Sequence, residues 1–383
     1  MIMNMVGGSG EVKPSYKVYG FEVDMTDDTK EYPVSYPKNI FGQLNGASFI
    51  ETPAYGTGES CMNDWADCPL ITGIKRQIGN SVSGWQDITD KRAPVLGTDT
   101  DDVMTYIPTW YMRIERSTRA IDGTDHKILT VAFSAGQLDS NWKDYAGSVG
   151  QKRIGHFRIG CYGPTYSSTD KAAHSKGGAL NALKYTSAQA RGEGYDGFTF
   201  FMHTYLASLL ILLYKSVDLS TAFGNGRLKA DTPSQSAVSF VNDFGFSGSV
   251  DRSQPLSAFW IQDIQGLCPW EVTNIYTSNR LKTGLGYSTS NKDELEFDLG
   301  PSSTIQGYLS DVVGSNEGGF IPANAASHGS DHTGFMCFVH WYGSSSLCYV
   351  GYIASGEEST GTNFLELNTT NTLNPVVRLS YRL

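Results

Sequence analysis

Short apolar blocks alternate with runs of small polar residues over the last fifty residues of the chain. The apolar blocks are Phe335–Val339, Cys348–Val350, Phe364–Leu367 and Val376–Leu379. The polar runs are Gly343–Ser346, Ser355–Asn363 and Asn368–Asn374. The blocks predict buried strands, and the runs predict exposed loops. Because strands hold a scaffold while surface loops carry contacts, this pattern favours binding over catalysis.

Alternating and apolar segments upstream predict further strands. The clearest are Tyr16–Val23, Val103–Glu115, Lys127–Phe133 and Ile154–Tyr162, and weaker ones are Ile71–Ile78 and Ser81–Trp85. Two helices are predicted over Thr186–Arg191 and Phe200–Val217. The second is apolar almost all round, which predicts a helix buried against a sheet, and the Gly-containing stretch Asp218–Gly226 is expected to end it. The mixture predicts an α+β fold.

The chain divides into two predicted regions. Residues 1–100 form a β-rich N-terminal region, expected to serve attachment or oligomerisation, and residues 101–383 form the second domain. Gly97–Asp102, at the boundary, is dense in acidic residues but lacks the twelve-residue calcium-loop pattern, so we expect a solvated turn. Arg227–Pro255 is polar and Ser-rich, which predicts an insert, and core aromatics return at Phe259–Val272.

Composition excludes several classes of function. Charged residues make up 18% of the chain, the net charge is −10, and there are 42 Gly and 21 Tyr. This balance suits a loop-rich virion or extracellular protein and disfavours nucleic-acid binding, which needs clustered Lys and Arg. Tyr205–Tyr214 is too short to span a bilayer, so no membrane insertion is expected. Met1–Gly10 lacks the pattern of a signal peptide, which predicts synthesis in the bacterial cytoplasm and release by another route, such as lysis.

No motif predicts an enzyme, a metal or a cofactor. Gly192–Gly197 fits G-x-G-x-x-G, but it joins two predicted helices, so a glycine loop is the better interpretation. The histidines are dispersed, and the closest group, His328, His332 and His340, does not predict a metal site. The cysteines show no C-x-x-C spacing; Cys61 and Cys68 could pair across a short loop, but buried free thiols are the simpler prediction.

Several segments in a distinctive order resemble a family of phage tail-fibre proteins. These segments begin at Val18 (VYGFEVD), Asp102 (DVMTYIPTWYMRI), Gly155 (GHFRIGCY) and Ala190 (ARGEGY), followed by Phe223-Gly-Asn-Gly and the terminal Arg378-Leu. The resemblance covers most of residues 16–383. In that family the C-terminal domain is similar to a C-type lectin fold and is often the variable protein of a diversity-generating retroelement. The resemblance therefore implies two helices flanking a small antiparallel sheet, with a solvent-facing surface built from the last strands and loops.

The resemblance and the polar runs together predict the ligand-binding residues. Tyr, Ser, Gly and Asn are typical of paratopes, because Tyr supplies contact area at low entropic cost. Adenine-directed mutagenesis acts on AAY codons, from which Glu357, Glu358 and Trp341 cannot arise, so these three fit diversification least well. The predicted residues are Trp341, Tyr342, Ser344, Ser345, Ser346, Tyr349, Tyr352, Ala354, Ser355, Glu357, Ser359, Thr360, Thr362, Asn363, Glu366, Asn368, Thr369, Asn371 and Asn374.

Among these residues, Trp341, Tyr342 and Tyr352 are the expected anchors. Phe364, Leu365, Leu367, Val376, Val377 and Leu379 are assigned to the core. The apolar blocks and Arg378–Leu379 are expected to be fixed framework, whereas the Tyr, Ser and Asn positions are expected to be replaceable. The calcium-binding signatures of sugar-binding lectins are absent from the sequence, which disfavours calcium-dependent sugar binding.

Three hypotheses on function remain at this point. The first is a virion adhesin, expected to be a homotrimer, that binds a host-surface protein or glycan and joins other virion proteins through its N-terminal region. The second is a formylglycine-generating-type enzyme on the same fold, which would require reactive thiols at Cys337 and Cys348. The third is a structural virion protein such as a head decoration.

Overall fold

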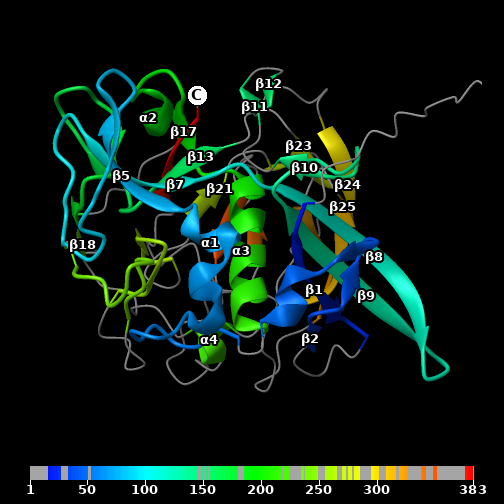
Figure 1. Cartoon of the computed structure of the whole chain (residues 1–383). Helices are drawn as coiled ribbons and strands as arrows, with labels where there is room; N and C mark the ends of the chain where they lie inside the picture. The colour runs from blue at the N-terminus through cyan, green and yellow to red at the C-terminus, as the bar shows by residue number, and fades with distance from the viewer. Residues whose placement is uncertain are drawn as a thin grey trace, which may run out of the picture.

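The computed structural model describes much of the N-terminal two thirds of the chain and scattered strands beyond. The described residues are 16–26, 33–50, 53–144, 148–149, 152–153, 156–179, 185–217, 219–223, 234–236, 238–248, 255–264, 270–272, 275–277, 280–284, 295–301, 308–315, 319–326, 338–341, 348–351 and 376–382. They form a mixed structure of helix and sheet, mostly β with few helices, which agrees with an α+β class (Figure 1).

A six-stranded antiparallel sheet contains the last strand of the chain, paired on both of its edges. Its order is β17 (Tyr195–Gly197), β30 (Leu379–Tyr381), β13 (Phe157–Gly160), β7 (Asp102–Ile107), β5 (Lys75–Asn80) and β6 (Gly84–Asp87). A five-stranded antiparallel sheet has the order β10 (Lys143–Asp144), β8 (Tyr111–Ile121), β9 (Thr124–Ser134), β1 (Val18–Asp24) and β2 (Val34–Ser35).

Strands from late in the sequence form two further sheets. One has the order β27 (Phe338–Trp341), β28 (Cys348–Gly351), β21 (Trp270–Val272) and β29 (Val376–Val377), and the other has β22 (Ile275–Thr277), β23 (Arg280–Gly284) and β24 (Leu295–Pro301).

The remaining strands pair two by two. These pairs are β25 (Tyr308–Ser315) with β26 (Gly319–Ala326), β3 (Asn39–Ile40) with β4 (Gln43–Leu44), β11 (Ser148–Val149) with β12 (Lys152–Arg153), β14 (Thr165–Tyr166) with β15 (Ala173–His174), β16 (Gly178–Ala179) with β18 (Ser234–Gln235), and β19 (Ser257–Ala258) with β20 (Ile261–Gln262).

The long helix α3 (Phe200–Tyr214) lies between the two large sheets (Figure 1). From Met202 to Tyr214 none of its side chains is more than 3% exposed, as the all-round apolar pattern predicted. The Tyr205 ring packs edge-on against Phe133 of β9 and Phe157 of β13, with ring centroids 5.4 and 5.7 Å away. One helix therefore supplies core to both sheets.

Local signals set both ends of α3. Thr199 caps its N-terminus, because its hydroxyl accepts a hydrogen bond from the Met202 amide at 3.2 Å. The helix ends at Lys215, which adopts the left-handed conformation at φ 52°. The sequence predicted a later end, at Val217, before the Gly-containing stretch Asp218–Gly226, but the left-handed conformation of Lys215 ends the helix earlier. A short helix, α4 (Leu219–Ala222), follows.

The helix predicted over Thr186–Arg191 is α2, which covers Tyr185–Gln189. It packs on the other face of the six-stranded sheet. Its Ala188 belongs to a small core with Met104 and Leu379, whereas Val103 and Ile159, from the opposite face of the strands, pack with α3. Two helices therefore flank a small antiparallel sheet. The remaining described helix is α1 (Pro69–Thr72). It lies in the first part of the chain, together with two 3-10 turns (Gly46–Phe49 and Asn63–Asp67).

Four strand predictions need correction. Of the strand predicted for Ser81–Trp85, residues 81–83 form the turn between β5 and β6. Val103–Glu115 is two strands, β7 and β8, because Pro108 lies between them and has no amide to donate to a ladder. The chain changes sheet at this break. Ile71 lies in α1 and not in the strand predicted for Ile71–Ile78, and Ile154–Tyr162 shortens to β13.

Strands from both sides of residue 100 share the two large sheets. Strands β1 and β2 pair in the same sheet as β8 and β9, and β5 pairs directly with β7. Among the described residues, the long strands of the expected N-terminal region therefore contribute to the same core as the rest of the chain.

Candidate functional site

The C-terminal hairpin carries the two predicted ligand-binding residues that the structure describes. Strands β27 and β28 pair antiparallel, with His340 opposite Tyr349 and Trp341 opposite Cys348. Trp341 is the last residue of β27, and Tyr349 is the second residue of β28. Both residues therefore lie next to the predicted polar run that connects the two strands.

The other predicted ligand-binding residues lie outside the described residues. They are Tyr342, Ser344, Ser345, Ser346, Tyr352, Ala354, Ser355, Glu357, Ser359, Thr360, Thr362, Asn363, Glu366, Asn368, Thr369, Asn371 and Asn374. Of the residues assigned to the core, Leu379 is fully buried, while Phe364, Leu365 and Leu367 lie outside the described residues.

Backbone ladders hold the strands that bound these segments. Strand β28 pairs with β21, where Trp270 lies opposite Val350, and β21 pairs in parallel with β29, where Trp270 also lies opposite Val376. Strand β30 then enters the six-stranded sheet between β17 and β13. Positions 342–347 therefore connect β27 to β28, which pair with each other. Positions 352–375 connect β28 to β29, which both pair with β21.

Arg378 fastens the last of these strands. Its guanidinium is only 1% exposed and donates to the carbonyl oxygens of Gly160 and Gln262, both at 2.8 Å. Burying a cation is costly unless its hydrogen-bonding groups find partners, and here backbone carbonyls supply them. This burial confirms the prediction that Arg378 and Leu379 belong to the framework.

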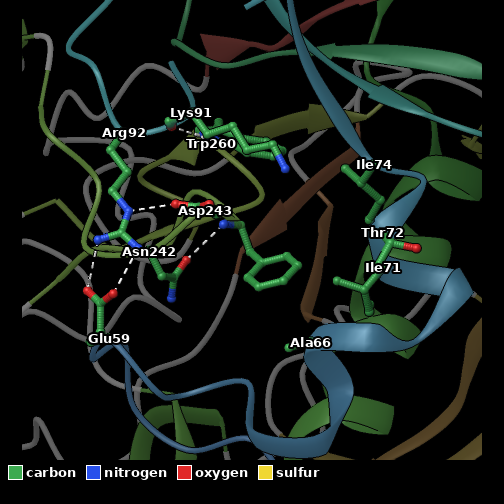
Figure 2. A pocket seen from close by; sticks show the side chains of 11 residues that line it. Glu59, Ala66, Ile71, Thr72, Ile74, Lys91, Arg92, Asn242, Asp243 and Trp260 are labelled. Atoms are coloured by element: carbon green, nitrogen blue, oxygen red, sulfur yellow. Dashed lines mark hydrogen bonds and ion pairs between the residues drawn. The ribbon is translucent and has the colours of Figure 1, made fainter. Parts of the chain in front are cut away.

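A pocket of about 340 Å³ opens on another part of the molecule (Figure 2). Its floor is apolar, and its rim carries charged groups. The lining residues are Glu59, Ala66, Ile71, Thr72, Ile74, Lys91, Arg92, Asn242, Asp243, Phe244 and Trp260. Asn242 shapes one wall, because its side chain accepts from the Phe244 amide at 3.0 Å and donates to the Gly58 carbonyl at 3.2 Å.

Three of the charged side chains that line the pocket pair with one another. Arg92 bridges Glu59 at 2.8 Å and Asp243 at 2.6 Å, and these two carboxylates raise the pKa of the arginine further above its usual value. The indole of Trp260 donates to the Lys91 carbonyl at 2.7 Å and closes the floor. These surface pairs are solvated and contribute little stability. The geometry suits a small, partly apolar group.

One residue of the acidic turn at residues 97–102, Asp102, is buried, although the sequence predicted a solvated turn. Asp99 is exposed, as predicted, but Asp102 is fully buried. The Asp102 carboxylate accepts from the Ser175 amide at 2.7 Å, the Arg191 Nε at 3.0 Å and the Tyr195 hydroxyl at 3.2 Å. Burial raises the pKa of Asp102 despite these donors. Only contacts far apart in sequence reveal that this carboxylate is structural.

Three cysteines in the described part of the chain are buried. Cys61, Cys68 and Cys161 are buried free thiols, so Cys61 and Cys68 do not pair. Burial raises the pKa of Cys61 and of Cys68 to about 11, which keeps both protonated and unreactive at neutral pH. The structure brings no three metal-ligating side chains together among its described residues, and His328 and His332 lie outside them.

Comparisons with protein-family models, with curated proteins and with solved structures found no match to this chain. No helix in the described part is long and apolar enough to cross a membrane.

Proposed function

We propose that this protein is a receptor-binding adhesin, a phage tail fibre or related virion protein, with a C-type-lectin-like fold. It binds a host-surface protein or glycan through the residues between its C-terminal strands. The observation that carries this proposal is the placement of those residues. Positions 342–347 and 352–375 both begin and end at laddered strands, and the chain then enters the six-stranded sheet between β17 and β13.

The arrangement of the core supports the fold part of the proposal. Helices α2 and α3 pack on opposite faces of a small antiparallel sheet, which is what the family resemblance implies. The sheet places its C-terminal strand beside β13 and β17, so the framework does not depend on the identity of the polar residues that precede it. A binding surface whose side chains can change without loss of the core is suited to diversification by a retroelement.

Composition supports the role of binding. The segment 342–375 is rich in Ser, Thr, Asn, Gly and Tyr, the residues that paratopes use for adaptable hydrogen bonds and rigid aromatic contacts. Single sites of this kind bind weakly, and we infer a homotrimer whose three sites raise avidity on a cell surface.

Host adsorption tests the proposal. The fluorescently labelled full-length protein is incubated with a panel of bacterial strains, and binding is measured by flow cytometry. Replacing Tyr342 and Tyr352 with Ala should lower binding to the strain that the wild type binds by at least about tenfold, the loss that removing aromatic anchors of 1.4 kcal/mol or more would produce.

Two tyrosines elsewhere on the surface provide a matched control. Tyr55 and Tyr166 are 61% and 41% exposed, so replacing both with Ala removes equal side chains outside the proposed site. The control variant should bind like the wild type, and both double variants should keep the wild-type melting temperature. Equal loss in the two double variants, or early melting of only the Tyr342 and Tyr352 variant, would contradict the assignment of these residues as ligand anchors.

A further inference from the structure

A row of polar and aromatic side chains crosses the face of the six-stranded sheet that α2 partly covers. The ladder places Lys75 opposite Tyr106, Tyr106 opposite Arg158, Arg158 opposite Tyr381, and Tyr381 opposite Tyr195. Directly opposed residues in an antiparallel ladder share a face. Five strands therefore bring these side chains into one line across the sheet. None of these residues belongs to the proposed adhesin site.

Three aromatic rings surround the Arg158 guanidinium in this row. Its central carbon lies 4.9 Å from the ring centroid of Trp85, 5.1 Å from that of Tyr106 and 5.5 Å from that of Tyr381. Distances under about 6 Å are those of cation–π contacts. The rings also contact one another, with 5.2 Å between the centroids of Trp85 and Tyr381. These ring contacts restrict the position of the Arg158 guanidinium.

A relay of hydrogen bonds fixes the orientation of the same guanidinium. The Nε of Arg158 donates to the Gln77 side-chain oxygen at 2.8 Å. The Gln77 amide nitrogen donates to one oxygen of Asp87 at 2.7 Å, and Lys75 donates to the other oxygen at 2.7 Å. Asp87 is thereby engaged by two donors, and these hydrogen bonds, led by that from Gln77, hold its pKa below the usual value.

The two terminal nitrogens of Arg158 are left without an acceptor among the described residues, since its one hydrogen bond there is made by Nε. The side chain is partly buried, and burial lowers its pKa below the usual arginine value. Asp87, the carboxylate whose charge acts on Arg158, accepts hydrogen bonds from Gln77 and Lys75. A partly desolvated cation that forms no ion pair with a carboxylate of the protein can bind an external anion.

We propose that Arg158 is the centre of a second binding site, which takes the carboxylate of an acidic sugar. The planar fork of a guanidinium matches the two oxygens of a carboxylate, whereas phosphate sites usually gather several donors or a helix N-terminus. Trp85 and Tyr106 are each partly exposed beside the fork and offer apolar surface to the pyranose ring. Lys75, whose side chain is 51% exposed, adds a positive charge at the edge.

Ligand-observed saturation-transfer NMR on the full-length protein tests this site, because the method detects weak binding to large proteins. The probes are sodium glucuronate, glucose, glutamate and inorganic phosphate, the last followed by ³¹P line width. We expect saturable transfer to glucuronate, little transfer to glucose or glutamate, and no broadening of the phosphate line. Glucose differs from glucuronate only at the carboxylate, and glutamate has carboxylates without the sugar ring.

Substitution at Arg158 gives the decisive comparison. Arg158→Lys keeps the charge but removes the fork, and it should weaken glucuronate binding at least about tenfold. Arg119→Lys is the matched control, since Arg119 pairs with Glu22 on the other large sheet, and it should bind like the wild type. If Arg158→Lys melts early, Tyr106→Leu replaces it, because this variant keeps the guanidinium but loses an aromatic wall and should also weaken binding.

Three results would overturn the proposal. Equal transfer to glucose and glucuronate would remove the carboxylate from the recognition. Undiminished glucuronate binding in both Arg158→Lys and Tyr106→Leu would place the ligand elsewhere. Phosphate or glutamate binding as strong as that of glucuronate would mean that the site is not selective for an acidic sugar.

Discussion

Buried charged residues define the framework at the scale of single residues. Asp102, Arg378 and Arg382 are almost completely inaccessible to solvent, and each has partners from distant parts of the chain. Asp102 joins β7 to the segment after α2 through Arg191 and Tyr195, and Arg378 joins β30 to β13 and β20. Such charges are tolerated only where their partners are present, so they specify how the segments meet.

The Asp196–Arg382 pair should make stability depend on pH. Burial raises the pKa of Asp196 from 3.8 to about 7, although Arg382 lies 3.9 Å away and favours the charged form. Between about pH 4 and pH 7 the folded protein therefore holds a proton on Asp196 that the unfolded chain has released. The contribution of this group to stability is fully present below pH 3.8 and is lost as the pH rises through about 7.

Urea unfolding at several pH values checks this expectation. Asp196→Asn should flatten the fall in unfolding free energy across that window, a fall of at most about 1.4 kcal/mol per pH unit for one group. Asp125→Asn, at an exposed position in β9, is the control and should keep the wild-type slope. A slope in Asp196→Asn equal to that of the wild type would show that Asp196 is not the titrating group.

At the scale of elements, the decisive feature is a helix shared by two sheets. The all-round apolar pattern of α3 predicts burial, but it does not say how many partners the helix has. The structure places the same Tyr205 ring against strands of both sheets. Pro108 makes this possible, because it ends β7 and lets the chain enter the second sheet as β8.

Two neighbouring substitutions in α3 should have different effects on stability. Leu209 is fully buried, and Leu209→Ala should cost about 2–5 kcal/mol through lost contacts and a cavity. Ser208 is equally buried, yet its hydroxyl has no hydrogen-bond partner in the described part of the structure. Ser208→Ala should therefore change stability by less than about 1 kcal/mol, or raise it, because no hydrogen bond is lost.

Thermal and chemical unfolding of both variants measure the difference. A loss for Ser208→Ala as large as that for Leu209→Ala would mean that the serine hydroxyl is paired. Similar small losses for both would mean that α3 is packed more loosely than its burial indicates.

At the scale of the whole molecule, the strands that form the framework and the segments proposed to bind the ligand are different parts of the sequence. The final strand β30 lies inside the main sheet, while positions 342–375 precede it in sequence. Replacing residues in that range should leave the buried contacts of Arg378 and Leu379 in place, because those contacts are made with Gly160, Gln262 and the core beside α2. The molecule can then keep one fold while its binding residues change.

Sequencing the DNA beside the gene, in the source genome and in its siblings, tests the diversification part of the proposal. We expect a reverse transcriptase gene and a near-copy of the 3′ end of the gene that differs mainly at adenines. Amino-acid changes among siblings should fall within 342–375 and spare Arg378 and Leu379, since replacing either would disturb the buried strand. Absence of the reverse transcriptase, or changes spread evenly over the chain, would contradict diversification.

The sequence by itself determined the local features: the main strands, the two helices, the buried character of α3 and the framework role of Arg378 and Leu379. These follow from periodicity and composition over a few consecutive residues. Tertiary structure alone decided that Asp102 is buried, that β7 and β8 belong to different sheets, and that Arg158 is surrounded by rings from three other strands. Burial of a charge and assembly of an aromatic cluster depend on partners far away in sequence, and no local pattern encodes such contacts. Trp85 and Arg158 are 73 positions apart, and Arg158 and Tyr381 are 223 positions apart.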